Sequence, residues 1–179
     1  MKVIAALSVL ILLLLAPPAV SQVPDDKLIV PGQRIGKWTL EMTIDDLLRM
    51  NGPRQPMGEI SGSREAIVRL EGPDVASADF WVHRWDLLRL RVFTIGRESH
   101  RVWGLQTSDP GYKTARGVSV DVPRAAVETA YGRPTALVPR LDTGQVLIYD
   151  ELGLALSVPF NVLFVIVFRP GTAKERWKF

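Results

Sequence analysis

The chain has no cysteine among its 179 residues. It can therefore form no disulfide, carry no lipid-bearing cysteine, and use no thiolate as a nucleophile or metal ligand. Histidine is also scarce: the two histidines, His83 and His100, stand far apart and form no i, i+2 or i, i+4 pair of the kind that binds metal. We expect no metal and no cofactor, and we interpret both histidines as structural or surface residues.

Other arrangements typical of catalysis are missing as well. No serine, histidine and acid set has a recognisable nucleophile setting, and no glycine-rich loop stands between a strand and a helix to bind phosphate. The acidic pair Asp25-Asp26 lies near the start of the chain, a few residues after an expected signal peptide at residues 1–21. The pair Asp45-Asp46 lies at the start of an expected helix, where negative charge is favourable. We therefore expect no enzymatic activity.

Charge of one sign is not concentrated anywhere. The 22 basic and 19 acidic residues give a net charge of +3 and are interspersed, which argues against nucleic acid as a partner. After the leader the longest apolar run is at residues 162–167, which is the length of a strand and too short to cross a membrane. We predict no membrane span after residue 21.

Residues 1–21 have the pattern of a cleavable signal peptide. Lys2 is followed by an apolar run at residues 3–15 broken only by Ser8, and Ala19 and Ser21 are small residues at the positions that signal peptidase recognises. The alternative is an uncleaved membrane anchor, but the run ends at a Pro-Pro pair before it reaches the roughly 20 residues that a span needs. We predict cleavage after Ser21 and export to the periplasm or the exterior.

The remaining chain contains an internal repeat. Residues 36–53 read GKWTLEMTIDDLLRMNGP, and residues 117–134 read GVSVDVPRAAVETAYGRP. Each begins with glycine, enters a short helix through a capping residue, and ends at a glycine closely followed by proline. We expect Thr43 and Asp121 to be the N-caps, and Gly52 and Gly132 to have positive φ at the helix ends.

After each expected helix the pattern changes to the period of strands. The first series is expected at residues 66–70, 78–85, 87–94 and 100–107, and the second at 145–150, 153–157 and 162–168. This predicts an α+β fold of two degenerate repeats, each a short helix packed on a three- to four-stranded antiparallel sheet. The expected segments are a signal peptide (1–21), an N-terminal segment (22–35), the first repeat (36–110), the second repeat (111–170) and a basic tail (171–179).

The entry and exit of these repeats resemble a known family. VPGQRIG at residues 30–36 with the following LEMTIDDLLRMNGP, and YKTARG at 112–117 leading to YGRP at 131–134, are similar to the helix-plus-sheet repeat of the β-lactamase-inhibitor-protein-like and SmpA/OmlA-like exported bacterial proteins. The chain departs from that family's secreted inhibitors and lipoproteins in having no cysteine. The resemblance implies a non-catalytic envelope or secreted protein whose exposed sheet face contacts another protein.

Strand parity indicates one candidate binding face. If Leu88, Leu90 and Val92 face the core, the alternate residues of the same strand face away from it. We expect one surface, facing away from the core, to be formed by Trp81, His83, Trp85, Arg89, Arg91 and Phe93. Surfaces rich in aromatic and arginine side chains are typical of interface hot spots.

Two alternatives stay open at this stage. The aromatic face could instead be a second core, covered by another sheet, by residues 23–30 or by the tail. For function, the main hypothesis is a non-enzymatic protein-binding or envelope-associated module, and the alternative is a carrier of an apolar or amphipathic small ligand. A cavity of several hundred cubic ångströms would favour the carrier, and an exposed patch on a filled core would favour the binding module.

Overall fold

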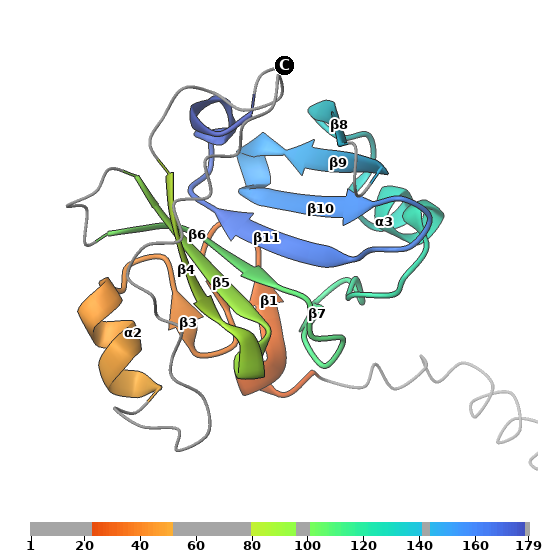
Figure 1. Ribbon diagram of the computed structural model, residues 1–179. Helices are drawn as coiled ribbons and strands as arrows, with labels where there is room; N and C mark the ends of the chain where they lie inside the picture. Colours follow the sequence, from red (N-terminus) through yellow and green to blue (C-terminus); the bar gives the residue numbers. More distant parts are fainter. Residues whose placement is uncertain (1–22, 52–79, 96–100, 141–143, 178–179) are drawn as a thin grey trace, which may run out of the picture.

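The computed structural model describes residues 23–51, 80–95, 101–140 and 144–177 (Figure 1). These residues form a mixed α+β fold that is mostly sheet, with two α-helices and two sheets. The predicted signal peptide, the strand expected at residues 66–70, His100 and Gly52 lie outside the described residues. Within them, no helix is long and apolar enough to cross a membrane.

The larger sheet is antiparallel throughout and has the strand order β4-β5-β6-β11-β10-β9-β8. Its strands confirm six of the expected ones and add β8, which the sequence analysis did not predict. The bounds are β4 (Phe80–Trp85), β5 (Leu90–Ile95), β6 (Val102–Thr107), β8 (Ala136–Arg140), β9 (Gly144–Tyr149), β10 (Leu154–Val158) and β11 (Phe164–Phe168).

A smaller sheet connects the N-terminal segment with the middle of the chain. Its order is β3-β2-β1-β7, from β1 (Leu28–Val30), β2 (Arg34–Ile35), β3 (Trp38–Thr39) and β7 (Lys113–Thr114). Strand β1 pairs with β2 in antiparallel fashion and with β7 in parallel. The N-terminal segment is therefore built into the fold through a strand that comes much later in the sequence.

Helix α2 (Ile44–Met50) begins as its sequence predicts. The Thr43 hydroxyl accepts a hydrogen bond from the Asp46 amide at 3.1 Å, and the Asp46 carboxylate accepts from the Thr43 amide at 2.9 Å. This reciprocal capping box satisfies amides that have no partner inside the helix. Leu47 is fully buried, so the helix is anchored to the sheet by its apolar side.

Helix α3 (Arg124–Tyr131) begins differently from the prediction. Its N-cap is Pro123, without a side-chain cap, and Asp121 instead lies in the preceding turn with φ of 71°. Val127 is the buried residue of this helix, Ala130 is partly buried against the same core, and Ala126 is exposed. The end is as predicted: Gly132 has φ of 77° and closes the helix.

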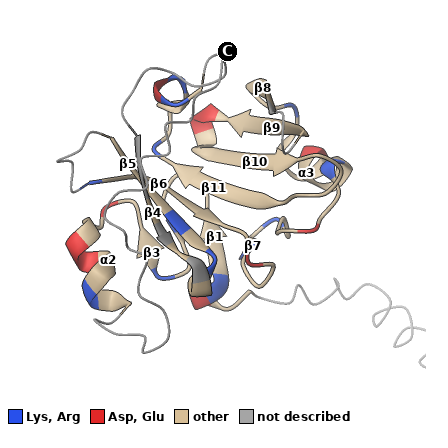
Figure 2. Cartoon of the chain, viewed as in Figure 1, with Lys and Arg blue, Asp and Glu red and all other residues tan. Residues whose placement is uncertain are grey.

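Both helices and the smaller sheet cover one face of the larger sheet. The core between them includes Leu47 of α2, Val127 of α3, and Leu90, Leu147 and Leu156 of the large sheet. Strands β9, β10 and β11 carry no charged residue, whereas α2 and α3 carry both signs (Figure 2). Apolar burial of this kind is the dominant favourable contribution to folding.

The opposite face of the large sheet is covered by the C-terminal tail. The short turn η4 (Ala173–Glu175) and Trp177 pack on Phe93, Trp103 and Phe168. Trp103 donates from Nε1 to the Thr172 hydroxyl at 2.9 Å, which fixes the beginning of the tail. The tail is therefore part of a second core and not a loose basic extension.

The large sheet contains two similar hairpins, one on each side of the central pair β6 and β11. Strands β4 and β5 are joined by the turn η2 (Asp86–Leu88), and β9 and β10 by the turn η3 (Asp150–Leu152). Each turn is followed by one residue of positive φ, Arg89 at 48° and Gly153 at 64°.

The entrances to the helices are also alike. The cap of α2, Thr43, forms an isolated antiparallel bridge with Arg101 shortly before β6, and the cap of α3, Pro123, does so with Asn161 shortly before β11. The strands β6 and β11 then pair with each other at the middle of the sheet. Each helix cap therefore bridges to a residue that shortly precedes one of the two central strands.

Candidate binding site

The strand register divides the predicted aromatic face between the two sides of the sheet. His83 lies opposite Val92 and Trp85 opposite Leu90, while Arg91 lies opposite Arg84. Because directly opposed residues share a face, the β4 residues His83 and Trp85 lie on the side of Leu90 and Val92, away from Arg91 and Phe93. The prediction of one surface formed by all six residues is wrong.

Burial removes several of these residues from the solvent. Trp85 is 9% exposed and belongs to the core under the helices, and Phe93 is 2% exposed and belongs to the core under the tail. His83 is half-buried, and burial lowers its pKa. Arg89 and Arg91 are exposed, whereas the side chain of Trp81 lies outside the described residues. The predicted residues are therefore divided among the core under the helices (Trp85), the core under the tail (Phe93) and the exposed surface (Arg89 and Arg91). Only for Phe93 does the alternative of a second core covered by the tail hold.

Arg176 completes this second core with a buried cation. It is 3% exposed, and its guanidinium carbon lies 4.0 Å from the centre of the Phe93 ring and 5.4 Å from that of Trp177. A guanidinium over an aromatic face is stabilised by the ring quadrupole. Of the six predicted residues, Phe93 thus contacts an arginine of the tail, Arg176, which was not among them.

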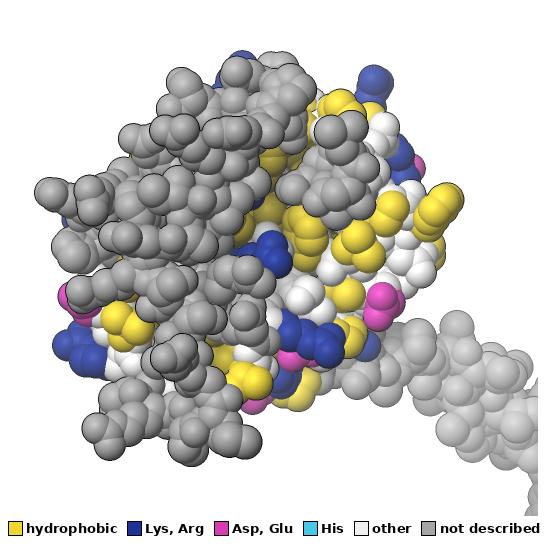
Figure 3. All heavy atoms as spheres, in the orientation of Figure 1, with side chains coloured by type: hydrophobic (Ala, Val, Ile, Leu, Met, Phe, Trp, Pro, Cys, Tyr) yellow, Lys and Arg dark blue, Asp and Glu magenta, His cyan; other side chains and the backbone are white. Residues whose placement is uncertain are grey.

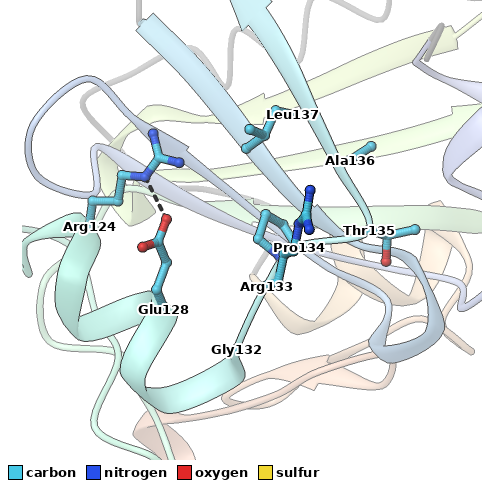
Figure 4. A pocket seen from close by; sticks show the side chains of 8 residues that line it. All are labelled: Arg124, Glu128, Gly132, Arg133, Pro134, Thr135, Ala136 and Leu137. Carbon is cyan, nitrogen blue, oxygen red and sulfur yellow. Dashed lines mark hydrogen bonds and ion pairs between the residues drawn. The ribbon is translucent and has the colours of Figure 1, made fainter.

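An open cleft lies elsewhere, between α3 and the first residues of β8. It has a volume of about 550 Å³ and is formed by Arg124, Glu128 and residues 132–137. Figure 4 shows Arg124 and Glu128 projecting from α3 on one side and Leu137 from β8 on the other. We call this feature the α3–β8 cleft.

Both ends of α3 are tied to β9, which fixes the walls of the cleft. At the start, Arg124 donates to the side chain of Gln145 at 2.7 Å. At the end, the Tyr149 hydroxyl donates to the carbonyl of Gly132 at 3.0 Å. Burial, together with the nearby Glu128 carboxylate, raises the pKa of Tyr149 to about 12, so the phenol stays a neutral donor at ordinary pH. The two hydrogen bonds thus fix the position of α3 relative to β9, so the walls of the cleft are preorganised.

The lining combines apolar surface with charge. Leu137 is 45% exposed, which is high for a large apolar side chain on a strand. Arg124 is engaged by Glu128 through an ion pair of 2.7 Å. Arg133 is exposed and has no ion-pair or hydrogen-bond partner among the described residues. The cleft therefore offers one uncommitted cation next to an apolar wall.

Further apolar surface adjoins the cleft at the β10–β11 turn. Phe160 is 87% exposed, and its carbonyl accepts from the Arg124 amide at 3.3 Å, which places the turn beside the start of α3. In the space-filling view apolar side chains gather on the side of the molecule where this turn and α3 lie (Figure 3). Exposed apolar surface of this kind marks interaction sites more often than chance.

The sequence carries only a weak signal for this site. The Gly-Arg-Pro at residues 132–134 indicates the end of a helix and nothing more, and strand β8 is not among the expected strands. The available signal was the alternation of Leu137 and Val138 before Pro139, of which Val138 is buried and Leu137 is not. Proline inside such a short run lowers the strand signal.

Comparison of the chain with protein-family models, with curated proteins and with solved structures gave no match. In the described part of the chain, no group of three or more histidine, aspartate and glutamate residues is placed to hold a metal ion. The α3–β8 cleft is therefore interpreted from its own geometry and chemistry.

Proposed function

We propose that this is an exported, non-enzymatic binding module, placed in the periplasm or outside the cell, that contacts another protein through the α3–β8 cleft. The observation that carries the proposal is the exposed Leu137 beside the uncommitted Arg133 in a cleft with fixed walls. Apolar surface flanked by arginine is the composition of protein interfaces. The leader-like residues 1–21 support export.

The second candidate is a carrier of a small amphipathic ligand. The cleft volume of about 550 Å³ favours it, because small-molecule sites have volumes in this range. The openness of the cleft and its lack of an aromatic lining favour a protein partner instead, since carriers enclose most of the ligand surface.

We also propose that the fold consists of two degenerate helix-plus-sheet repeats related to the β-lactamase-inhibitor-protein-like and SmpA/OmlA-like proteins. The repeated order of helix, hairpin with a turn like η2 or η3, and central strand supports this. The positive φ of Arg89 and Gly153 after the two turns supports it further. The proposed relation carries no residue role with it, and the cleft lies in the second repeat.

The test is capture of partners from an envelope extract, with the chain lacking residues 1–21 as bait. Leu137→Glu places a charge in the cleft, and we expect it to abolish a capture that the unsubstituted protein shows. The matched control is Leu152→Glu, because Leu152 is 41% exposed but lies in η3, outside the cleft lining. Circular dichroism establishes that both variants are folded. Equal capture by both variants would exclude the cleft as the contact site.

A further inference from the structure

The α3–β8 cleft lies at an edge of the large sheet. Strand β8 pairs with β9 on one side, and no described strand pairs with its other side. An edge strand presents backbone amides and carbonyls that can pair with an added strand. The cleft residues 135–137 run into this edge, so backbone donors and acceptors lie next to the apolar wall.

Pro139 limits where an added strand could pair. It lacks an amide hydrogen and therefore removes one donor from β8. Pairing is thus favoured along the part of β8 before Pro139, which is the part that lines the cleft. Thr135 is fixed there, because its amide donates to the Ile148 carbonyl at 2.7 Å and its hydroxyl accepts from the Asp150 amide at 3.2 Å.

The charge of the cleft selects the kind of segment. Arg124 is neutralised by Glu128, which leaves Arg133 as the cation that a ligand can engage. An acidic side chain near Arg133 would gain a charge-assisted hydrogen bond, and a lysine there would be repelled. Leu137 would take an apolar side chain of the same segment.

We infer that the cleft binds an extended segment of a partner protein, which adds a strand to the edge of β8 and presents an acidic residue to Arg133 and an apolar residue to Leu137. This inference rests on the proposed function and names the chemistry of the partner. The segment is bound through its backbone by the edge and through its side chains by the cleft.

The experiment measures fluorescence anisotropy with the chain lacking residues 1–21 and synthetic peptides of about seven residues, a typical strand length. The peptides alternate valine and threonine and end in a pair of aspartates, asparagines or lysines. We expect the aspartate peptide to bind roughly tenfold more tightly than the asparagine peptide, as a charge-assisted hydrogen bond predicts, and the lysine peptide to bind most weakly. Methylation of alternate backbone nitrogens on the pairing edge should remove binding.

Variants of the protein assign the effect to the cleft. Arg133→Gln should abolish the preference for aspartate, and Leu137→Glu should abolish binding of all the peptides. Lys113→Gln removes an exposed cation of β7, outside the cleft lining, and should preserve both the affinity and the preference.

Several outcomes would overturn the inference. Equal affinity for the aspartate and lysine peptides would exclude recognition of an acidic segment, and unchanged binding of the methylated peptide would exclude strand pairing. Binding of laurate that depends on Arg133, without binding of any peptide, would assign the cleft to a small amphiphile. Self-association that Leu137→Glu removes, seen by sedimentation, would assign it to a second copy of the chain. If cleft-dependent capture from extract persists while all peptides fail, the proposed function stands and this inference alone fails.

Discussion

Arg89 and Gly153 occupy the same place in two similar hairpins, each directly after a short turn and with positive φ. Glycine adopts this conformation without steric cost, whereas a residue with a Cβ is strained in it. At Gly153 the space also demands glycine, because an added Cβ would lie 2.2 Å from the Phe168 carbonyl oxygen. At Arg89, by contrast, a residue with a Cβ has positive φ, so its backbone is strained.

Arg89→Gly should therefore stabilise the protein. The relief of left-handed strain exceeds the extra entropy of glycine in the unfolded chain, so we expect a gain of up to about 1 kcal/mol in the free energy of unfolding. Urea denaturation measures it. Arg89→Ala is the control, since it removes the same exposed side chain and keeps the strain. A glycine variant no more stable than the alanine variant would contradict the prediction.

Asp46 makes the start of α2 sensitive to acid. Hydrogen bonds from the backbone and side chain of Thr43, together with Arg49, lower the pKa of Asp46 from 3.8 to about 2. Because the folded pKa lies below the unfolded one, the carboxylate stabilises the fold above about pH 4, and this stabilisation is lost as the pH falls from 4 towards 2.

Asp46→Asn should destabilise the protein at pH 6, and the difference from the unsubstituted protein should shrink at pH 2.5. Urea denaturation at the two pH values measures this. Asp45→Asn is the control, because Asp45 lies in the same turn but outside the capping box. A difference from the unsubstituted protein that is as large at pH 2.5 as at pH 6 would show that the capping carboxylate is not its source.

At the scale of elements, the tail acts as a cover for the second face of the sheet. Trp177 is 3% exposed and contacts Trp103 and Phe168 with ring centres 5.8 and 5.4 Å apart. Trp177→Ala should lower the free energy of unfolding by about 3 kcal/mol or more, as truncation of a buried tryptophan does. Glu175→Ala, an exposed position in the same turn, should change it by less than about 0.5 kcal/mol. A decrease in the free energy of unfolding of less than about 1 kcal/mol for Trp177→Ala would show that the tail is not part of the core.

Elements with a local signal could be predicted from the sequence. Thr43 and Asp46 define the start of α2 by a hydrogen-bonding pattern within four residues, and the alternating apolar runs define most of the large sheet. Strands β1, β2, β3 and β7 are two or three residues long, too short for any periodicity. Their pairing depends on partners distant in the sequence.

Assignment of faces failed for a different reason. The register from β4 to β5 depends on the turn η2, which pairs Trp85 with Leu90 and so places odd-numbered residues of β4 beside even-numbered residues of β5. A bulge then inserts Trp103 between Val102, paired with Thr94, and Gly104, paired with Phe93. Neither the turn nor the bulge can be predicted from the alternation of residues along a single strand. The α3–β8 cleft lies at an edge of the sheet, and which strand forms an edge is known only once the complete strand order is known.

At the scale of the whole molecule, the central pair β6 and β11 joins the two ends of the large sheet. Its register places Leu105 opposite Val167 and Gly104 opposite Phe168. The parallel pair of β1 and β7 makes a second connection, between the N-terminal segment and the middle of the chain. Neither end of the molecule can therefore complete its hydrogen bonding without the other, and we interpret the described fold as one cooperative unit despite its proposed repeats.

The pairing of β6 with β11 also has a consequence for the timing of folding. When the chain is synthesised, β6 is complete long before β11, so the edge of β6 that pairs with β11 in the native fold is at first unpaired. Contacts between residues so distant in sequence form slowly, and a waiting strand edge invites pairing with other chains. The early half of the protein thus keeps an unpaired strand edge until β11 has been synthesised, and the central strands that stabilise the native state make the nascent chain vulnerable to aggregation.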